Sequence, residues 1–342
     1  MPALRSKHLL ALLLPPLALS SFSANAQRTD EDVARVISWE NDTFARGRTT
    51  DRWYTNGFHY ADARLRLVTD PAKPAAKMLL DPAGQRSEDP VTVFLFGQNM
   101  YTPRFVADPA PQTNDRPWGG FLYLGAGAAE YFGDWHRAVD VKVGVIGPAS
   151  LAEQTQKVVH KVFDAQEPLG WDNQLRPRLG AQATYAFAYR VRGLGLDALG
   201  LQPYAKATLG NTKVLGTAGA SLILGERNRI VGAPDEGDFL AVDLSQPGNY
   251  LPPPFNSLTF VAQAQISAVA RNYFVTGSTF GTRSDIRLRR YVATVAVGVG
   301  WQVCKALRID YNLKRRGPEF ESSDSRSTDL YQRYGEIRVT WR

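Results

Sequence analysis

The sequence of 342 residues has only one cysteine, Cys304, and only four histidines. A single cysteine excludes a fold that is held together by disulfide bonds within the chain. Three histidines, His59, His136 and His160, follow the first 26 residues, which disfavours a zinc centre built from histidines. The G-x-S-x-G, H-E-x-x-H and phosphate-loop motifs are also absent. If the chain is a hydrolase, we therefore expect a water molecule activated by one histidine rather than a serine nucleophile.

Long apolar runs are missing as well. Beyond residue 26, no stretch approaches about 18 uninterrupted apolar residues, so no transmembrane helix is predicted. Even so, 44% of the residues are apolar and 11% are aromatic, which is ample for a folded core and disfavours intrinsic disorder. The formal net charge of +7 indicates an anionic partner, either nucleic acid or an acidic membrane surface.

The N-terminus has the layout of a secretory signal peptide. Arg5 and Lys7 precede an apolar run at residues 9–19, and Ala24-Asn25-Ala26 offers a cleavage site of small residues. This order is typical of export signals, and an amphipathic first helix is the alternative. We predict a signal peptide at residues 1–26 and a mature domain at residues 27–342. An exported protein has little occasion to bind nucleic acid.

Polar and apolar residues alternate along many segments of the mature chain, which is typical of β-strands with one apolar face. The predicted strands lie at residues 36–41, 58–67, 91–99, 121–130, 139–145, 178–191, 202–209, 218–224, 258–268, 291–301, 307–314 and 335–341. Several exceed the roughly 5–6 residues usual in soluble proteins and suit the roughly 9–11 residues that cross a bilayer at a tilt.

The same alternation would fit a soluble β-sandwich whose apolar side is turned inward. The export signal, the strand length and an even count of about twelve strands favour a membrane barrel instead. In lipid every backbone amide must be paired within the protein, and a closed barrel achieves this pairing. The sequence therefore predicts an all-β fold, a transmembrane antiparallel β-barrel of about 12 strands in the bacterial outer membrane.

The end of the chain supports this prediction. Ile337, Val339 and Trp341 form one apolar face of the last strand. This strand resembles the C-terminal strand of bacterial outer-membrane barrels, which usually ends on the aromatic residue, whereas this chain adds Arg342. Residues 70–88 and 225–256 are rich in Pro, Gly, Asp and Ser and are predicted to be loops.

One helix is predicted at residues 152–164, with Ser150 as its N-cap and Glu153 completing a capping box. At 100° per residue, Leu151, Val158, Val159 and Val162 share one side, and Glu153, Gln156, His160 and Asp164 share the opposite side. His160 and Gln156 are one turn apart, close enough to share a ligand. The alternative is a solvated histidine on a surface helix.

A second polar cluster follows the first predicted strand, at Asn41 and Asp42. Adjacent oxygen ligands of this kind suit a hard cation such as calcium. The alternative is an Asn-Asp turn, followed by a Thr-Asn-Gly turn at residues 55–57.

Six spaced motifs, in order over nearly the whole mature chain, resemble the outer-membrane lipid A 3′-O-deacylase family. They are Glu40-Asn41-Asp42; Thr50-Asp51-Arg52 with Tyr54-Thr55-Asn56-Gly57; Asn114-Asp115-Arg116-Pro117-Trp118-Gly119-Gly120-Phe121-Leu122-Tyr123; Gly144-Val145-Ile146-Gly147-Pro148 followed by Gln156 and His160; Gly170-Trp171-Asp172-Asn173-Gln174-Leu175; and Asn272-Tyr273-Phe274 with Ser278-Thr279-Phe280. The resemblance implies a twelve-stranded barrel and a calcium-dependent esterase that acts on lipid A, with its site between the barrel wall and a short loop helix at the extracellular side.

Carried over by motif, the resemblance implies His160 as the general base, with Asn41 and Asp42 supplying the calcium ligands. It implies that Thr55 and Gln156 complete the site. Where family members can have a Lys-Arg pair after the Tyr-x-Pro turn, this chain has Arg104 and no lysine, so Arg104 is the expected contact to a substrate phosphate. Either Gln166 or Glu167 stands where a glutamate would be expected.

Two other functions remain open at the level of sequence. An outer-membrane phospholipase could use the same histidine and calcium on a different lipid. A non-catalytic porin or structural barrel would instead conduct ions and leave lipid A unchanged.

Overall fold

The computed structural model describes residues 33–45, 52–64, 73–80, 90–191, 198–225, 231–237, 257–280, 285–304, 306–322 and 331–341. The predicted signal peptide at residues 1–26 lies outside the described residues, as do the end of one predicted strand at residues 65–67 and parts of both predicted loops. Within the described residues, no helix is both long enough and apolar enough to cross a membrane.

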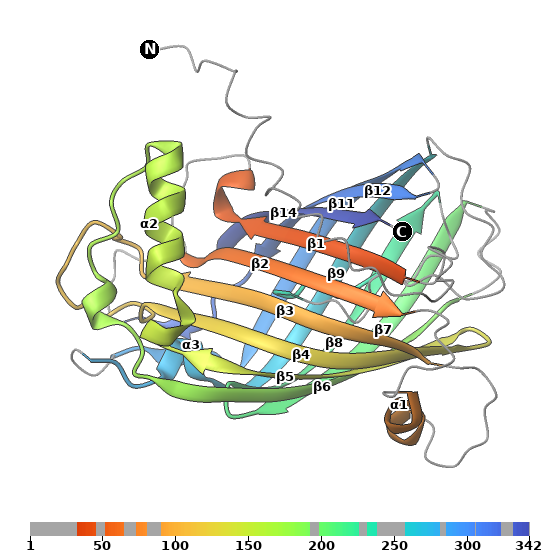
Figure 1. Cartoon of the computed structure of the whole chain (residues 1–342), viewed down its shortest axis with the longest axis horizontal. Coiled ribbons are helices and arrows are strands. Elements are labelled where there is room, and N and C mark those ends of the chain that lie inside the picture. Colours follow the sequence, from red (N-terminus) through yellow and green to blue (C-terminus); the bar gives the residue numbers. More distant parts are fainter. Residues whose placement is uncertain are drawn as a thin grey trace, which may run out of the picture. The chain divides into compact units, whose positions relative to one another are not determined.

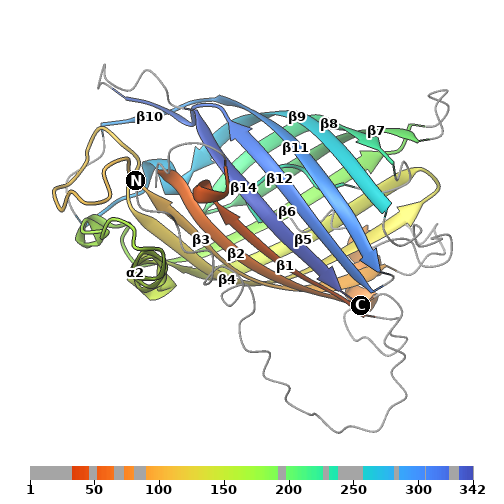
Figure 2. The same cartoon turned by 90° about the horizontal axis from the view of Figure 1, so that it is seen from above.

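Twelve strands form a closed antiparallel barrel, in which each strand pairs with the barrel strands before and after it and β1 closes the ring on β14 (Figures 1 and 2). They are β1 (Val33–Asn41), β2 (Trp53–Arg64), β3 (Val91–Thr102), β4 (Gly119–Phe132), β5 (Trp135–Ile146), β6 (Arg178–Tyr189), β7 (Leu199–Gly210), β8 (Lys213–Leu224), β9 (Ser257–Asn272), β11 (Tyr291–Cys304), β12 (Leu307–Arg316) and β14 (Gln332–Trp341). Two short strands, β10 (Arg287–Leu288) and β13 (Phe320–Glu321), pair with each other outside the ring. The predicted barrel of about twelve strands is confirmed.

The barrel turns its apolar side chains outward. On β11, Val295 and Val297 are exposed, whereas Thr294 and Gln302 are buried in the lumen. A soluble sandwich would bury the valines and expose the polar residues, so that alternative is wrong. An exposed apolar band on a closed ring is the arrangement that a lipid environment stabilises.

The connections define the two ends of the barrel. β1 ends at Asn41, and we call this the Asn41 end; the long connections at residues 103–118 and 147–177 and the two-residue connection at 211–212 are at the same end. The opposite end, where β1 begins, has the two-residue connection at 133–134 and the connections at 65–90 and 225–256. Short and long connections are thus found at both ends.

Among the described residues, three α-helices accompany the strands: α1 (Lys73–Leu80), α2 (Ala152–Phe163) and the single turn α3 (Tyr273–Thr276). Helix α1 lies in the stretch predicted to be a loop, so that prediction was wrong for residues 73–80. Ala76 and Leu80 are one turn apart and pack against Ala128 and Val139 of the barrel wall. This tertiary packing stabilises a helix that is too short to be stable alone.

Helix α2 confirms the predicted helix and its start at Ala152, but not the predicted N-cap. Ser150 is not the N-cap: Leu151 takes that position with a left-handed φ of 58°, and no side chain caps the helix. The Ser150 hydroxyl instead donates to the carbonyl oxygen of Gly147 at 2.6 Å. The prediction of a capping box was therefore wrong. Ser150 belongs to a 3₁₀ turn at Pro148–Ser150 that precedes the helix, and its hydroxyl bonds within that turn.

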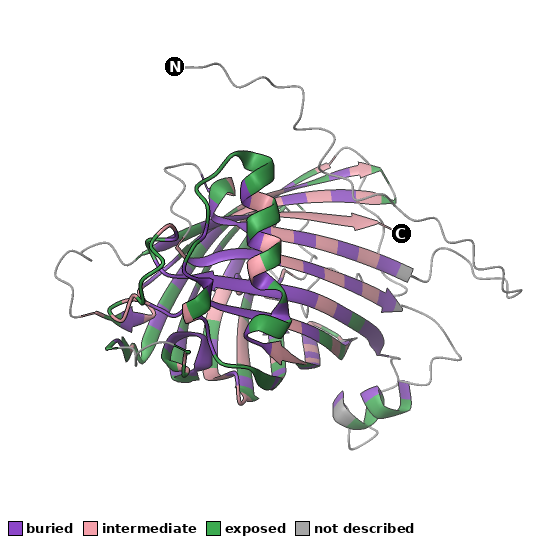
Figure 3. Ribbon diagram, turned by 60° about the vertical axis from the view of Figure 1, so that its left-hand side comes forward, coloured by how far each residue is buried: buried purple, intermediate pink, exposed green. Residues whose placement is uncertain are grey.

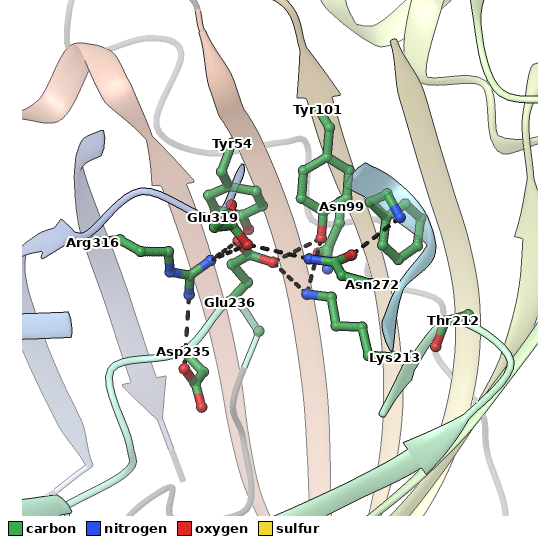
Figure 4. Close-up of polar contacts among 12 residues, drawn as sticks. Tyr54, Asn99, Tyr101, Thr212, Lys213, Asp235, Glu236, Asn272, Arg316 and Glu319 are labelled. Atoms are coloured by element: carbon green, nitrogen blue, oxygen red, sulfur yellow. Dashed lines mark hydrogen bonds and ion pairs between the residues drawn. The ribbon is translucent and has the colours of Figure 1, made fainter. Parts of the chain in front are cut away.

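Residues 231–237, inside the predicted loop at 225–256, lie in the barrel lumen. Glu236 pairs with Lys213 at 2.8 Å and with Arg316, and it accepts a hydrogen bond from the Tyr101 hydroxyl at 2.7 Å (Figure 4). Asp235 lies 2.5 Å from the ammonium group of Lys206. Acidic residues of this luminal segment thus neutralise basic side chains that point inward from the strands.

Gly237 ends the described part of the luminal segment in a crowded position. Its φ is +59°, and a Cβ there would come within 2.8 Å of His59 Nε2 and 3.0 Å of the Tyr123 hydroxyl, so the close approach requires glycine. Its amide donates to Glu40 Oε2 at 3.2 Å, and Glu40 Oε1 lies 2.6 Å from Lys314 Nζ. The luminal segment therefore contacts the residue that directly precedes Asn41.

Candidate functional site

A cavity of about 540 Å³ lies between the first three strands and α2, at the Asn41 end of the barrel. Five of the six residues predicted for the site line this cavity, namely Asn41, Thr55, Arg104, Gln156 and His160. Trp39 also lines it and alternates with Glu40, whose carboxylate is in the lumen. The cavity is therefore on the outer, lipid-facing side of the wall.

Asn41 ends β1 and starts the 3₁₀ turn at Asp42–Phe44. Its side-chain oxygen accepts from the Thr43 amide at 2.8 Å, and its amide group donates to Asn56 Oδ1 at 3.2 Å. Asn56 Oδ1 also accepts from the Trp39 indole at 2.7 Å. The strand therefore ends in an Asn-capped turn, and Asn56 is a site residue that the sequence analysis did not single out, although it stands in the same motif as Thr55.

Thr55 belongs to β2 and not to a turn. The pairing of β2 with β3 shifts between Tyr54 and Asn56, which is an irregularity of the bulge type. The Thr55 hydroxyl is 2.5 Å from that of Thr102 on β3. The alternative of a Thr-Asn-Gly turn at residues 55–57 is thus wrong, because these residues continue the barrel wall.

Gln156 faces the cavity from α2 and is buried. Its Oε1 accepts a hydrogen bond from the Trp171 indole at 2.8 Å. Its Nε2 is buried, and the described part of the protein offers it no hydrogen-bond acceptor. The indole thus sets the orientation of the amide and leaves a donor for a bound molecule.

His160 lies one turn further along α2 and is 5% exposed. Its Nδ1 is hydrogen-bonded to the main-chain carbonyl oxygen of Gln166. Since a carbonyl oxygen can only accept, Nδ1 carries the proton, and the lone pair of the neutral ring is on Nε2. The alternative of a solvated surface histidine is therefore wrong: the helix turns its polar side toward the wall.

Gln166 and Glu167, the two residues at the point where a glutamate was expected, differ in their position relative to the cavity. Gln166 lines the cavity and contacts His160 through its main chain, whereas Glu167 is exposed and is not among the lining residues. Of these two residues, Gln166 is thus the one that contacts His160.

Asp42 is buried beside Asn41 but is not one of the residues that line the cavity. Among the described residues, no group of three His, Cys, Asp or Glu side chains is placed to hold a metal ion. The side chains near Asn41 nevertheless offer oxygen donors of three kinds: the Asp42 carboxylate, the Asn41 amide and the Thr55 hydroxyl. These oxygen donors are of the types that calcium binds, and main-chain carbonyls and water can complete its coordination.

Arg104 lies at the rim of the cavity and is exposed. Its main-chain amide donates to Asp115 Oδ2 at 2.8 Å, and the Trp53 indole donates to Asp115 Oδ1 at 3.0 Å. Burial raises the pKa of the Asp115 carboxyl above its ordinary value, although hydrogen bonds from the Arg104 and Arg116 amides oppose the change. Asp115 thereby holds the connection that carries Arg104 against the barrel rim.

The closed ring and its outward apolar band define the class of this protein, that of membrane β-barrels. The family model described as "Outer membrane protein LpxR" matches residues 9–342. The chain therefore belongs to the LpxR family, the lipid A 3′-O-deacylase family whose motifs it resembles, and it is a protein of the bacterial outer membrane.

One solved structure supports this fold. LpxR from Salmonella typhimurium is similar with a TM-score of 0.72 and 18% sequence identity, over 90% of this chain and 99% of that chain. The β domain of the Bordetella autotransporter BrkA has a TM-score of 0.43 and 8% identity, over 91% of this chain and 98% of that chain. A comparison with curated proteins gave no match.

Proposed function

We propose that this chain is an ester hydrolase that removes the 3′-O-linked acyloxyacyl chain of lipid A in the outer leaflet. Membership of the LpxR family supports the choice of substrate. The observation that carries the proposal is that Asn41, Thr55, Gln156 and His160 line one cavity on the lipid-facing side of the barrel. A lipid ester can reach such a cavity from the leaflet without leaving the membrane.

His160 is the proposed general base. With Nδ1–H held by the Gln166 carbonyl, Nε2 takes a proton from a water molecule while the water oxygen bonds to the ester carbonyl carbon. The carbonyl electron pair moves onto its oxygen and returns as the bond to the sugar oxygen breaks. The proton then passes from the imidazolium to that sugar oxygen, and the products are a free fatty acid and a 3′-hydroxyl group.

Gln156 is the proposed donor to the developing oxyanion. Its Nε2 has no acceptor among the described residues, and Trp171 holds the amide in one orientation. A preorganised donor of this type typically contributes roughly 3–4 kcal/mol to transition-state stabilisation.

The remaining lining residues match the two parts of the substrate. Met100, Val159 and Phe163 give the cavity an apolar side that suits an acyl chain. Arg104 at the rim can form charge-assisted hydrogen bonds to a phosphate of the substrate. The sugar ester then lies between these two parts, beside His160.

Calcium is the proposed cofactor, with Asp42 and Asn41 as the residues that would hold it. When bound, it would supply positive charge to the ester carbonyl oxygen. Asn41 is already oriented by its bonds to Thr43 and Asn56, which limits the movement needed to offer an oxygen ligand.

The first test is the variant His160→Ala, which we expect to abolish deacylation while the barrel still folds and inserts. Mass spectra of lipid A from cells that express each variant measure the reaction, and heat-modifiable mobility on gels reports folding. Gln154→Ala, on the exposed side of the same helix, is the matched control and should retain activity. Unchanged release of the 3′ chain by His160→Ala would refute the assignment, and release of fatty acid from phospholipid alone would favour the phospholipase.

The second test removes the metal. Excess chelator should stop lipid A hydrolysis by the purified wild-type protein, and added calcium should restore it. Asp42→Asn should raise the calcium concentration needed for half-maximal activity, because the cation loses a charged ligand. Full activity in excess chelator would remove calcium from the proposal.

A further inference from the structure

Helix α2 buries its polar side and exposes its apolar side. Gln156 and His160 are buried, whereas Leu151, Val158 and Val162 are 51%, 63% and 45% exposed. Figure 3 shows exposed positions alternating with buried ones along this helix. In water this polarity would be unfavourable, since a helix on the surface of a soluble protein turns its apolar stripe inward.

The helix packs on the outside of the barrel wall. Its start lies over Gly120 of β4, where a Cβ would overlap the side chains of Ser150 and Ala152. Gln98 on β3 donates through Nε2 to the Ser150 carbonyl oxygen at 2.7 Å. Gly120 has the same strand parity as the exposed Leu124, so the contact is on the lipid-facing side. Figure 1 shows α2 running across the ends of the neighbouring strands.

The lipid-facing surface of the barrel reaches the level of this helix. Leu179, the second residue of β6 at the Asn41 end, is 71% exposed, and Val143 on the adjacent β5 is also exposed. The peptide between β5 and α2 is only five residues long, from Gly147 to Leu151. The exposed stripe of α2 therefore continues the apolar surface of the wall.

Charged residues of α2 are confined to a separate side. Glu153, Lys157 and Lys161 follow one another at intervals of four residues, and Lys157 Nζ lies 2.6 Å from Glu153 Oε1. At 100° per residue this row lies between the buried side and the apolar stripe. An apolar stripe with a basic polar side is the pattern of helices that lie in the plane of a membrane interface.

We propose that α2 is an interfacial helix whose apolar stripe, Leu151, Val158 and Val162, is seated among the acyl chains of the leaflet that surrounds the Asn41 end. The lysines of the charged row then lie at the level of the lipid phosphates. The cavity beneath the helix opens at the depth where acyl chains meet headgroups. The inference rests on exposure and position, and it holds whether or not the chain hydrolyses lipid A.

Fluorescent labels at two exposed positions of α2 test this proposal. The only cysteine is first removed with Cys304→Ser, and Val158→Cys in the apolar stripe or Lys157→Cys in the charged row is then labelled with an environment-sensitive probe. The full-length barrel is reconstituted in phosphatidylcholine vesicles that carry a bromine or nitroxide quencher on the upper part of the acyl chain. We expect the label at residue 158 to be blue-shifted and quenched by the lipid, and the label at residue 157 to be quenched several-fold more by aqueous iodide.

Two results would overturn the proposal. Equal iodide quenching at both positions would place the stripe in water. A blue shift at residue 158 that depends on protein concentration and is insensitive to the lipid quencher would indicate a second copy of the chain. The same labels in a His160→Ala background should give the same signals, so a failure of the hydrolase proposal remains distinguishable from a failure of this one.

Discussion

The polar groups of the cavity are held by neighbours that lie 6 to 15 residues from them in the sequence. Trp171 orients Gln156, the Gln166 carbonyl selects the tautomer of His160, and Asn56 binds Asn41. Each of these partners supplies a hydrogen bond in a place with little water, where a misplaced polar group is costly. Catalysis by such a site would depend on these neighbours as well as on the groups that touch the ester.

At this scale we expect Trp171→Phe to lower kcat/KM for lipid A hydrolysis by roughly 2- to 10-fold, with little change in KM. The loss follows from one hydrogen bond worth about 0.5–1.5 kcal/mol, without which the Gln156 amide can rotate. Steady-state kinetics with purified lipid A in detergent measure the effect.

Trp118→Phe is the matched control. The two indoles pack with ring centroids 5.0 Å apart and both are buried, but Trp118 Nε1 has no hydrogen-bond acceptor among the described residues. Both variants should lose similar thermal stability, and only Trp171→Phe should lose activity. Equal activity losses would assign the effect to packing.

Among the elements, the luminal segment at residues 231–237 is the one whose position local patterns do not predict. Its Glu236 is buried between Lys213 and Arg316. A buried charge pair is a weak source of stability by itself, but removing one partner leaves the other charges without compensation.

We therefore expect Glu236→Ala to destabilise the barrel by about 3–5 kcal/mol, measured as a lower denaturant midpoint or unfolding temperature in detergent. Glu153→Ala breaks an exposed pair with Lys157 on α2 and should cost only about 0.5 kcal/mol or less. If the two variants were equally stable, the luminal segment would not be anchored through Glu236.

For the molecule as a whole, the lumen is the feature that separates a porin from a barrel that uses only its outer wall. The luminal segment contacts β1, β2 and β5 through Glu40, His59 and Lys142. A cavity of only about 80 Å³ lies beside Asp235 and Glu236. The polar interior thus serves to pair charges and brace the wall.

We expect the wild-type protein to give no stable conductance steps in planar bilayers, because the luminal segment lies across the water-filled path that a porin needs. Deleting residues 231–237 should produce such steps if the barrel still inserts, which heat-modifiable mobility would report. Stable conductance by the wild-type protein at porin-like levels would contradict this expectation and would support the alternative that the protein is a porin.

The barrel itself could be predicted from residue order, since the alternation that marks a strand depends only on neighbours along the chain. Twelve strands and the helix at α2 follow from that local pattern, whereas the outward direction of the apolar faces required the export signal, the strand length and the strand count as well. The six motifs likewise supplied four of the residues that line the cavity, Asn41, Thr55, Gln156 and His160, with Asp42 buried next to it.

Only the tertiary structure determined how α2 is oriented and where the luminal segment lies. Amphipathicity identified the two sides of α2, but only its packing on the wall showed that the polar side is buried and the apolar side exposed. Composition marked residues 225–256 as a loop, but only the lysine and arginine side chains of distant strands explain why part of it enters the lumen. Both outcomes depend on contacts between residues tens of positions or more apart, such as Gln98 with Ser150 and Arg316 with Glu236. A pattern read over a few neighbours carries no information about such contacts.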